Sequence, residues 1–135
     1  MSDHRVRTVG GLRWLRLSTG ERLTTCARFW LVPYGHARVW WLYHREHAGD
    51  LRRTRWRLVY RSHKMAAAML AATICQRATA QYPRPLEHEA TRGQWLATYR
   101  RRVDAELGHA LDLGELKAEQ FNDAVAPAMQ LWGGP

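Results

Sequence analysis

The chain has 135 residues, a formal net charge of +9 and 46% hydrophobic residues. This length favours a single domain over residues 1–135, and the apolar content is enough to close a core. No apolar run is long enough to cross a bilayer, and the first residues lack the apolar stretch of a signal peptide, so we expect a cytoplasmic protein with no membrane partner. Two cysteines are too few for a disulfide scaffold or a four-cysteine zinc site.

Positive charge is concentrated in the first half of the chain. Residues 1–64 hold 14 Lys and Arg against four acids, a net of +10, whereas residues 65–135 hold seven against eight, a net of −1. This asymmetry is typical of a region that faces a polyanion. Nineteen of the 21 cations are Arg, which suits bidentate phosphate contacts, although a GC-rich genome produces the same bias.

A basic, β-rich part is predicted over about residues 1–62, because β-branched and aromatic residues alternate there with polar ones between turn signals. We expect strands over residues 12–18, 22–32, 36–45 and 53–61. Thr19-Gly20 offers a turn after the first strand, and Pro33-Tyr34-Gly35 interrupts the chain after the second.

A helical part is predicted over about residues 63–132, since the hydrophobic spacing changes at Ser62, which is placed to cap a helix. An Ala-rich helix is expected to run to about residue 81, a second helix to cover residues 91–107, and a third to lie near residues 115–126. The predicted fold is α+β, an antiparallel meander of three or four strands followed by about three helices, with at least one helix packed on one sheet face.

A hairpin centred on Gly49 places Arg45 opposite Arg53 and Trp41 opposite Arg57. One sheet face then carries interleaved Arg and aromatic side chains: Trp41, Tyr43, Arg45, Arg53, Arg55, Arg57 and Arg61. The opposite face carries a core surface for the Ala-rich helix: Trp40, Leu42, Trp56, Leu58 and Tyr60. Arg5, Arg7, Arg13 and Arg16 extend the basic surface, but their phases differ and we do not expect them all on one face.

Guanidinium groups suit phosphate oxygens and flat rings suit stacking, so the Arg and aromatic face predicts a surface that binds nucleic acid or a protein partner. The same residues also fit a solvated face, with Arg stems lying over Trp41 and Tyr43.

Little in the sequence points to catalysis. His44 and His47, with Glu46 and His63, are the candidates for a metal site, but no Cys pair or HExxH motif supports them. No GxSxG motif and no Gly-rich phosphate loop is present. We therefore expect no catalytic residues, no metal and no cofactor, and a metal-dependent nuclease built on His44 and His47 is a weaker alternative.

Three strands followed by a helix, with Arg and Trp on the sheet, are similar in outline to small β-sheet DNA readers such as AP2 domains and integrase arm-binding domains. In those families the sheet enters the major groove, and here residues 40–68 correspond. The leading hypothesis is a noncatalytic nucleic-acid-binding protein, with DNA favoured over RNA. The alternative is a small interaction module, such as an inhibitor or adaptor from a phage or mobile element, including anti-defence proteins, that docks on an acidic surface of a nucleic-acid-handling enzyme.

Overall fold

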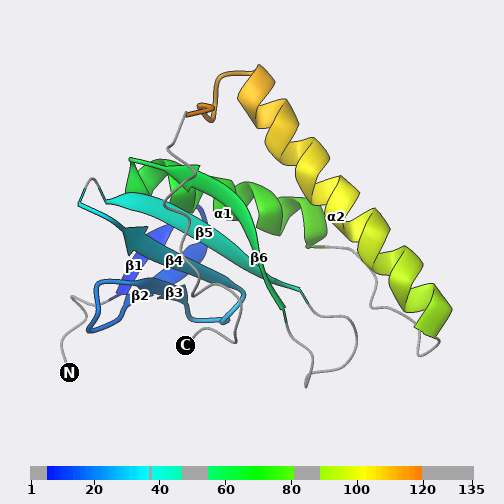
Figure 1. Ribbon diagram of the computed structural model, residues 1–135, viewed down its shortest axis with the longest axis horizontal. Coiled ribbons are helices and arrows are strands. Elements are labelled where there is room, and N and C mark those ends of the chain that lie inside the picture. The colour runs from blue at the N-terminus through cyan, green and yellow to red at the C-terminus, as the bar shows by residue number, and fades with distance from the viewer. Residues whose placement is uncertain (1–5, 37, 47–54, 81–88, 120–135) are drawn as a thin grey trace.

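The computed structural model describes residues 6–36, 38–46, 55–80 and 89–119. Six strands form one antiparallel sheet in which each strand lies beside its neighbours in the sequence, and two helices follow (Figure 1). The elements are β1 (Val6–Val9), β2 (Leu12–Arg16), β3 (Arg22–Thr24), β4 (Phe29–Tyr34), β5 (Val39–Glu46), β6 (Arg55–Ser62), α1 (Met65–Thr79) and α2 (Glu89–Asp112). The α+β class and the antiparallel meander are confirmed, but the sheet has six strands where three or four were predicted.

The strand β1 was not predicted, and it forms a hairpin with β2 around Gly10 and Gly11. Both glycines have positive φ, +57° and +87°, which matches the twist of a two-residue hairpin turn. A Cβ atom at Gly10 would lie 2.4 Å from Thr73 Oγ1 of α1. The turn therefore needs glycine at this position both for its backbone and for its close approach to the helix.

The main core lies between α1 and one face of the sheet. The sheet contributes Leu12, Trp14, Phe29, Leu31, Trp40 and Leu42, all buried. The small side chains Ala68, Ala71 and Ala72 of α1 are fully buried against them, which lets the helix approach the strands closely. The predicted packing of the Ala-rich helix on Trp40 and Leu42 is confirmed. The N-cap of α1 is Lys64 and not Ser62 as predicted, although the Ser62 Oγ accepts a hydrogen bond from the Lys64 backbone N–H at 3.0 Å.

The helix α2 packs mainly against α1 and extends beyond both predicted ends. Its buried stripe consists of Tyr99, Val103, Leu107 and Ala110. The third predicted helix is not found where it was expected to begin, because residues 115–119 are not helical; residues 120–126 lie outside the described residues. Leu116 is nevertheless buried in the main core. Neither helix in the described part of the chain combines the length and apolar content needed to cross a membrane.

The predicted register of β5 and β6 is wrong. Trp41 pairs with Arg61 and Leu42 with Tyr60, but the next residue, Tyr43, pairs with Leu58. Val59 is thus an extra residue on β6, a β-bulge that reverses the faces of all β6 residues before it. Trp56 and Leu58 consequently lie on the face away from α1, not in the core surface predicted for them.

Replacement of Leu42 by Ala tests the main core. Leu42 is fully buried between α1 and the sheet, so Leu42→Ala should lower the free energy of unfolding by about 2 to 5 kcal/mol in urea denaturation followed by Trp fluorescence. Leu113→Ala is the matched control, because Leu113 is 60% exposed and should change stability by no more than about 0.5 kcal/mol. Equal effects of the two substitutions would contradict the assignment of the core.

Candidate functional site

The structure separates the residues of the predicted Arg and aromatic face. Trp41, Tyr43, Arg45 and Arg61 share the face away from α1, because Trp41 pairs with Arg61 and Arg45 pairs with Trp56. Arg55 and Arg57 pair with Glu46 and His44 and lie on the helix side of the sheet. Arg53 lies outside the described residues. The single face on which the prediction depended is therefore not formed.

The rings on that face are largely buried. Trp30, Val32, Trp41 and Tyr43 form a second apolar cluster, and burial raises the pKa of Tyr43 to about 12. The Cζ atom of Arg61 lies 5.2 Å from the centre of the Trp41 ring, a cation–π contact that covers the ring. Base stacking on Trp41 or Tyr43 thus requires these contacts to open, and a nucleic-acid role for this face stays a prediction.

Arg57 takes part in a charged cluster that joins the sheet to α2. Glu46 is 3% exposed and accepts hydrogen bonds from Arg100 Nε at 2.8 Å and Arg100 Nη2 at 2.7 Å. Arg57 lies between two carboxylates, with Nε 3.2 Å from Glu46 and Nη1 3.1 Å from Asp104. Hydrogen bonding to Glu46 raises the pKa of Arg100. This arrangement positions α2 on the sheet and leaves Arg57 poorly placed to contact a polyanion.

His44, proposed as a metal ligand, is a core residue. It is 1% exposed, its Nε2 is hydrogen-bonded to Tyr99 Oη at 2.9 Å, and its ring stacks on Phe29 at 4.7 Å between centres. Burial raises the pKa of Tyr99. His47 lies outside the described residues, and among the residues that are described no group of three or more His, Cys, Asp or Glu is arranged to hold a metal ion.

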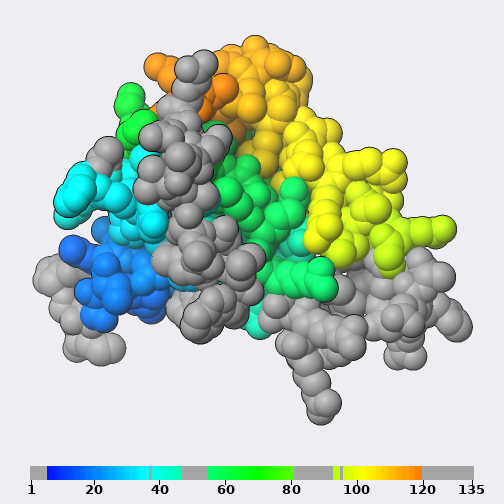
Figure 2. All heavy atoms as spheres, in the orientation of Figure 1, coloured from blue at the N-terminus to red at the C-terminus, as the bar shows by residue number. Residues whose placement is uncertain are grey.

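A pocket rich in arginine lies at the opposite end of β5 from Glu46, about 20 Å away at the ordinary rise of a strand. It has a volume of about 350 Å³ and is formed by the β2–β3 turn and the β4–β5 turn. The described residues that line it are Arg16, Ser18, Thr19, Gly20, Arg22, Pro33, Gly35, Arg38 and Trp40. We call it the arginine pocket. In Figure 2 the blue and cyan segments that contain it lie together at one flank of the molecule, away from the yellow α2.

The three arginines are held close together by the backbone. Arg16 and Arg22 pair directly across β2 and β3, which places their Cβ atoms roughly 5 Å apart. The Cζ of Arg22 lies 5.6 Å from the centre of the Trp40 ring, and its Nη1 donates a hydrogen bond to the Gly20 carbonyl. Arg38 comes from the other turn and has a φ of 48°, a left-handed conformation that is uncommon for a residue with a side chain.

Positive charge accumulates in the arginine pocket. The pKa of Arg22 is lowered by burial and then by the charges of Arg16, Arg7 and Arg38. No acidic residue is among the described residues that line the pocket. The neighbouring Glu21 carboxylate accepts hydrogen bonds from Thr19 Oγ1 and, at 2.7 Å, from Trp30 Nε1, a residue of the second apolar cluster. An anion with several acceptor oxygens is the ligand that such an arrangement favours.

Sequence reasoning missed this pocket although one signal for it was available. The Thr19-Gly20 turn was predicted, and a hairpin folded there brings Arg16 opposite Arg22. The sequence around Arg38 gives no comparable signal. Arg38 comes close to Arg16 and Arg22 only because β4 pairs with β5 and a second turn lies at the same end of the sheet.

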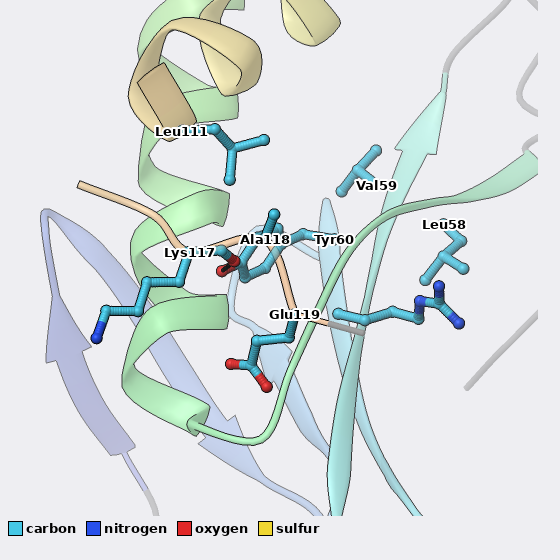
Figure 3. Close-up of a pocket in the computed structure, with 8 residues that line it drawn as sticks. Leu58, Val59, Tyr60, Leu111, Lys117, Ala118 and Glu119 are labelled. Atoms are coloured by element: carbon cyan, nitrogen blue, oxygen red, sulfur yellow. Dashed lines mark hydrogen bonds between the residues drawn. The ribbon is translucent and has the colours of Figure 1, made fainter. Parts of the chain in front are cut away.

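A second pocket, of about 290 Å³, lies beside β6 (Figure 3). β6 contributes Leu58, Val59 and Tyr60 to its lining, and Leu111 of α2 and the segment 117–119 complete it. Tyr60 Oη donates a hydrogen bond to the Lys117 carbonyl at 2.9 Å, which holds this segment on the strand. The lining includes Glu119 as well as Arg61 and Lys117, so it offers less excess positive charge than the arginine pocket.

Comparison with known proteins gives no family assignment. No protein-family model, no curated protein and no solved structure matches the chain. The outline resemblance to β-sheet DNA readers therefore gains no support from them.

Removal of the Arg100 side chain tests the charged cluster. Arg100→Ala leaves the buried Glu46 carboxylate with Arg57 as its remaining ion pair among the described residues. We expect a loss of about 1 to 3 kcal/mol in the free energy of unfolding, below the range for a fully buried pair because Arg100 is 39% exposed. Arg101→Ala, at the exposed neighbouring position, should change stability by about 0.5 kcal/mol or less. Equal stabilities of the two variants would argue against the cluster.

The contacts of Glu119 predict a pH-dependent contribution to stability. Hydrogen bonds from Ser62 Oγ and from His63 lower the pKa of Glu119 in the folded state. Its contribution is therefore present above the ordinary pKa of 4.5 and is lost as the pH falls through the lowered value. In urea denaturation, Glu119→Gln should be less stable than the parent chain near neutral pH, and the difference should shrink as the pH falls below the ordinary pKa and through the lowered one. A difference that does not change with pH would contradict this assignment.

Proposed function

We propose that this chain is a noncatalytic nucleic-acid-binding protein that contacts phosphates with the arginines at the pocket end of its sheet, with DNA favoured over RNA. The observation that carries the proposal is that Arg16 pairs directly with Arg22 and that Arg38 lines the same arginine pocket. Like charges directly opposite each other on neighbouring strands are destabilising, so a bound anion would relieve a repulsion that the fold itself maintains.

A nucleic acid is an anion that also fits the surroundings of the pocket. Arg7 is exposed on β1 and pairs with Trp14, which shares the sheet face of Arg16, so Arg7 extends the positive field from the pocket along that face. Arg13 is exposed on the opposite face. A nucleic-acid strand presents a regular row of phosphates that such a field attracts. Arg45 and Arg61, on the face away from α1, strengthen attraction at longer range. An acidic surface of a protein partner is the alternative ligand for the same charges.

Binding of labelled oligonucleotides at several salt concentrations tests the proposal. Fluorescence anisotropy with duplex DNA, single-stranded DNA and RNA should give affinities that fall steeply between about 50 and 200 mM salt. Arg16→Ala should weaken binding similarly across sequences and reduce the slope of log affinity against log salt by about one. Arg16 is exposed on β2, so its removal should leave the thermal melt nearly unchanged.

Arg77→Ala is the matched control, because it removes the same charge from an exposed position at the far end of α1. It should leave both the affinity and the salt slope close to those of the parent chain.

Absence of binding to all three nucleic acids at low salt, together with Arg16-dependent binding to an acidic polypeptide such as polyglutamate, would overturn the proposal in favour of a protein-interaction module.

A further inference from the structure

The arginine pocket differs from the open basic surface around it in having walls on two sides. Arg16 and Arg22 enter from the β2–β3 hairpin, and Arg38 enters from the β4–β5 turn. The remaining described lining is uncharged and consists of Ser18, Thr19, Gly20, Pro33, Gly35 and Trp40. A compact group that projects from its parent molecule can enter such a pocket more readily than the middle of a continuous strand.

The number of unesterified oxygens on the phosphate group separates the end of a strand from its middle. An internal phosphodiester has two unesterified oxygens and one negative charge. A terminal phosphate has three acceptor oxygens and a charge between −1.5 and −2 at about pH 7. Three guanidinium groups without an acidic neighbour in the described lining match the terminal group in both respects.

The aromatic residue of the pocket does not favour a stacked base. Trp40 is 8% exposed, and the guanidinium of Arg22 lies over its ring. The ring supports Arg22 in place and leaves the polar groups of the pocket to face the ligand. A pocket of about 350 Å³ has room for a phosphate group and part of the attached sugar, so recognition is expected to centre on the phosphate.

From these observations we infer that the arginine pocket binds the terminal phosphomonoester of a nucleic-acid strand end. The inference rests on the proposed function for the identity of the attached polymer. The phosphate chemistry itself does not distinguish a 5′ end from a 3′ end, and the two ends are separate arms of the test.

The test compares oligonucleotides that are identical except at one end. Fluorescence anisotropy measures affinity for strands that carry a 5′-phosphate, a 3′-phosphate or hydroxyls at both ends. One phosphorylated form should bind about tenfold or more tightly than the hydroxyl form, the factor expected for added charge-assisted hydrogen bonds. Arg38→Gln should abolish this preference, and Arg16→Gln should reduce it, whereas Arg77→Gln should retain it. Circular dichroism and a thermal melt check that each variant is folded.

The outcomes for the pocket and for the proposed function are distinguishable. Equal affinity for all three oligonucleotides with a steep salt dependence overturns the end-binding inference and leaves the nucleic-acid-binding proposal standing. A preference for a phosphorylated end that survives both Arg38→Gln and Arg16→Gln in folded protein also overturns the inference, because the end would then bind outside the arginine pocket. If no oligonucleotide binds but inorganic phosphate binds in an Arg38-dependent manner by calorimetry, the phosphate pocket is supported, whereas strand-end recognition and the proposed function both fail.

Discussion

The extra residue Val59 on β6 determines how the sheet distributes its aromatic and charged side chains. Without it, regular alternation would place Arg57 on the face of Arg45 and would place Trp56 on the helix side beside Glu46. The bulge reverses these positions. Arg57 then meets Glu46 and Asp104, and Trp56 joins the second apolar cluster, where its ring lies 5.6 Å from that of Trp30.

The two ends of the sheet differ in whether their positive charges are compensated, and the bulge contributes to this at the end near Glu46 by placing Arg57 there. At the end near Glu46, two arginines and two carboxylates from β5, β6 and α2 lie in one cluster, so opposite charges compensate each other and hold the helix in place. At the other end, Arg16, Arg22 and Arg38 converge, with no acidic residue among the described lining of their pocket. The charges near Glu46 therefore serve the packing of α2, and those of the arginine pocket remain accessible to a ligand.

Local sequence patterns predicted much of the fold but not the longer-range geometry. The Ala-rich helix, the α2 stripe of Tyr99 and Val103, and the strands around Trp40 and Leu42 follow from hydrophobic spacing. β1 was missed even though Gly10-Gly11 is a hairpin signal, because its four residues offer only two valines. The bulge at Val59 has no signal in a single sequence, since regular alternation already places Trp56 and Tyr60 on one face, whereas the bulge puts them on opposite faces. Strict alternation therefore assigned Arg55 and Arg57 to the wrong face.

The arginine pocket is also a place where local stability and charge arrangement are in conflict. The pairing of Arg16 with Arg22 sets like charges opposite each other, and a φ of 48° at Arg38 is a conformation that glycine adopts at less cost. Both features oppose folding locally, and neither contributes to the main core. Strained and repulsive arrangements of this kind gather at binding sites, where the ligand supplies the compensating interaction. A negatively charged group in the pocket offsets the repulsion, so a bound anion is expected to stabilise the folded chain.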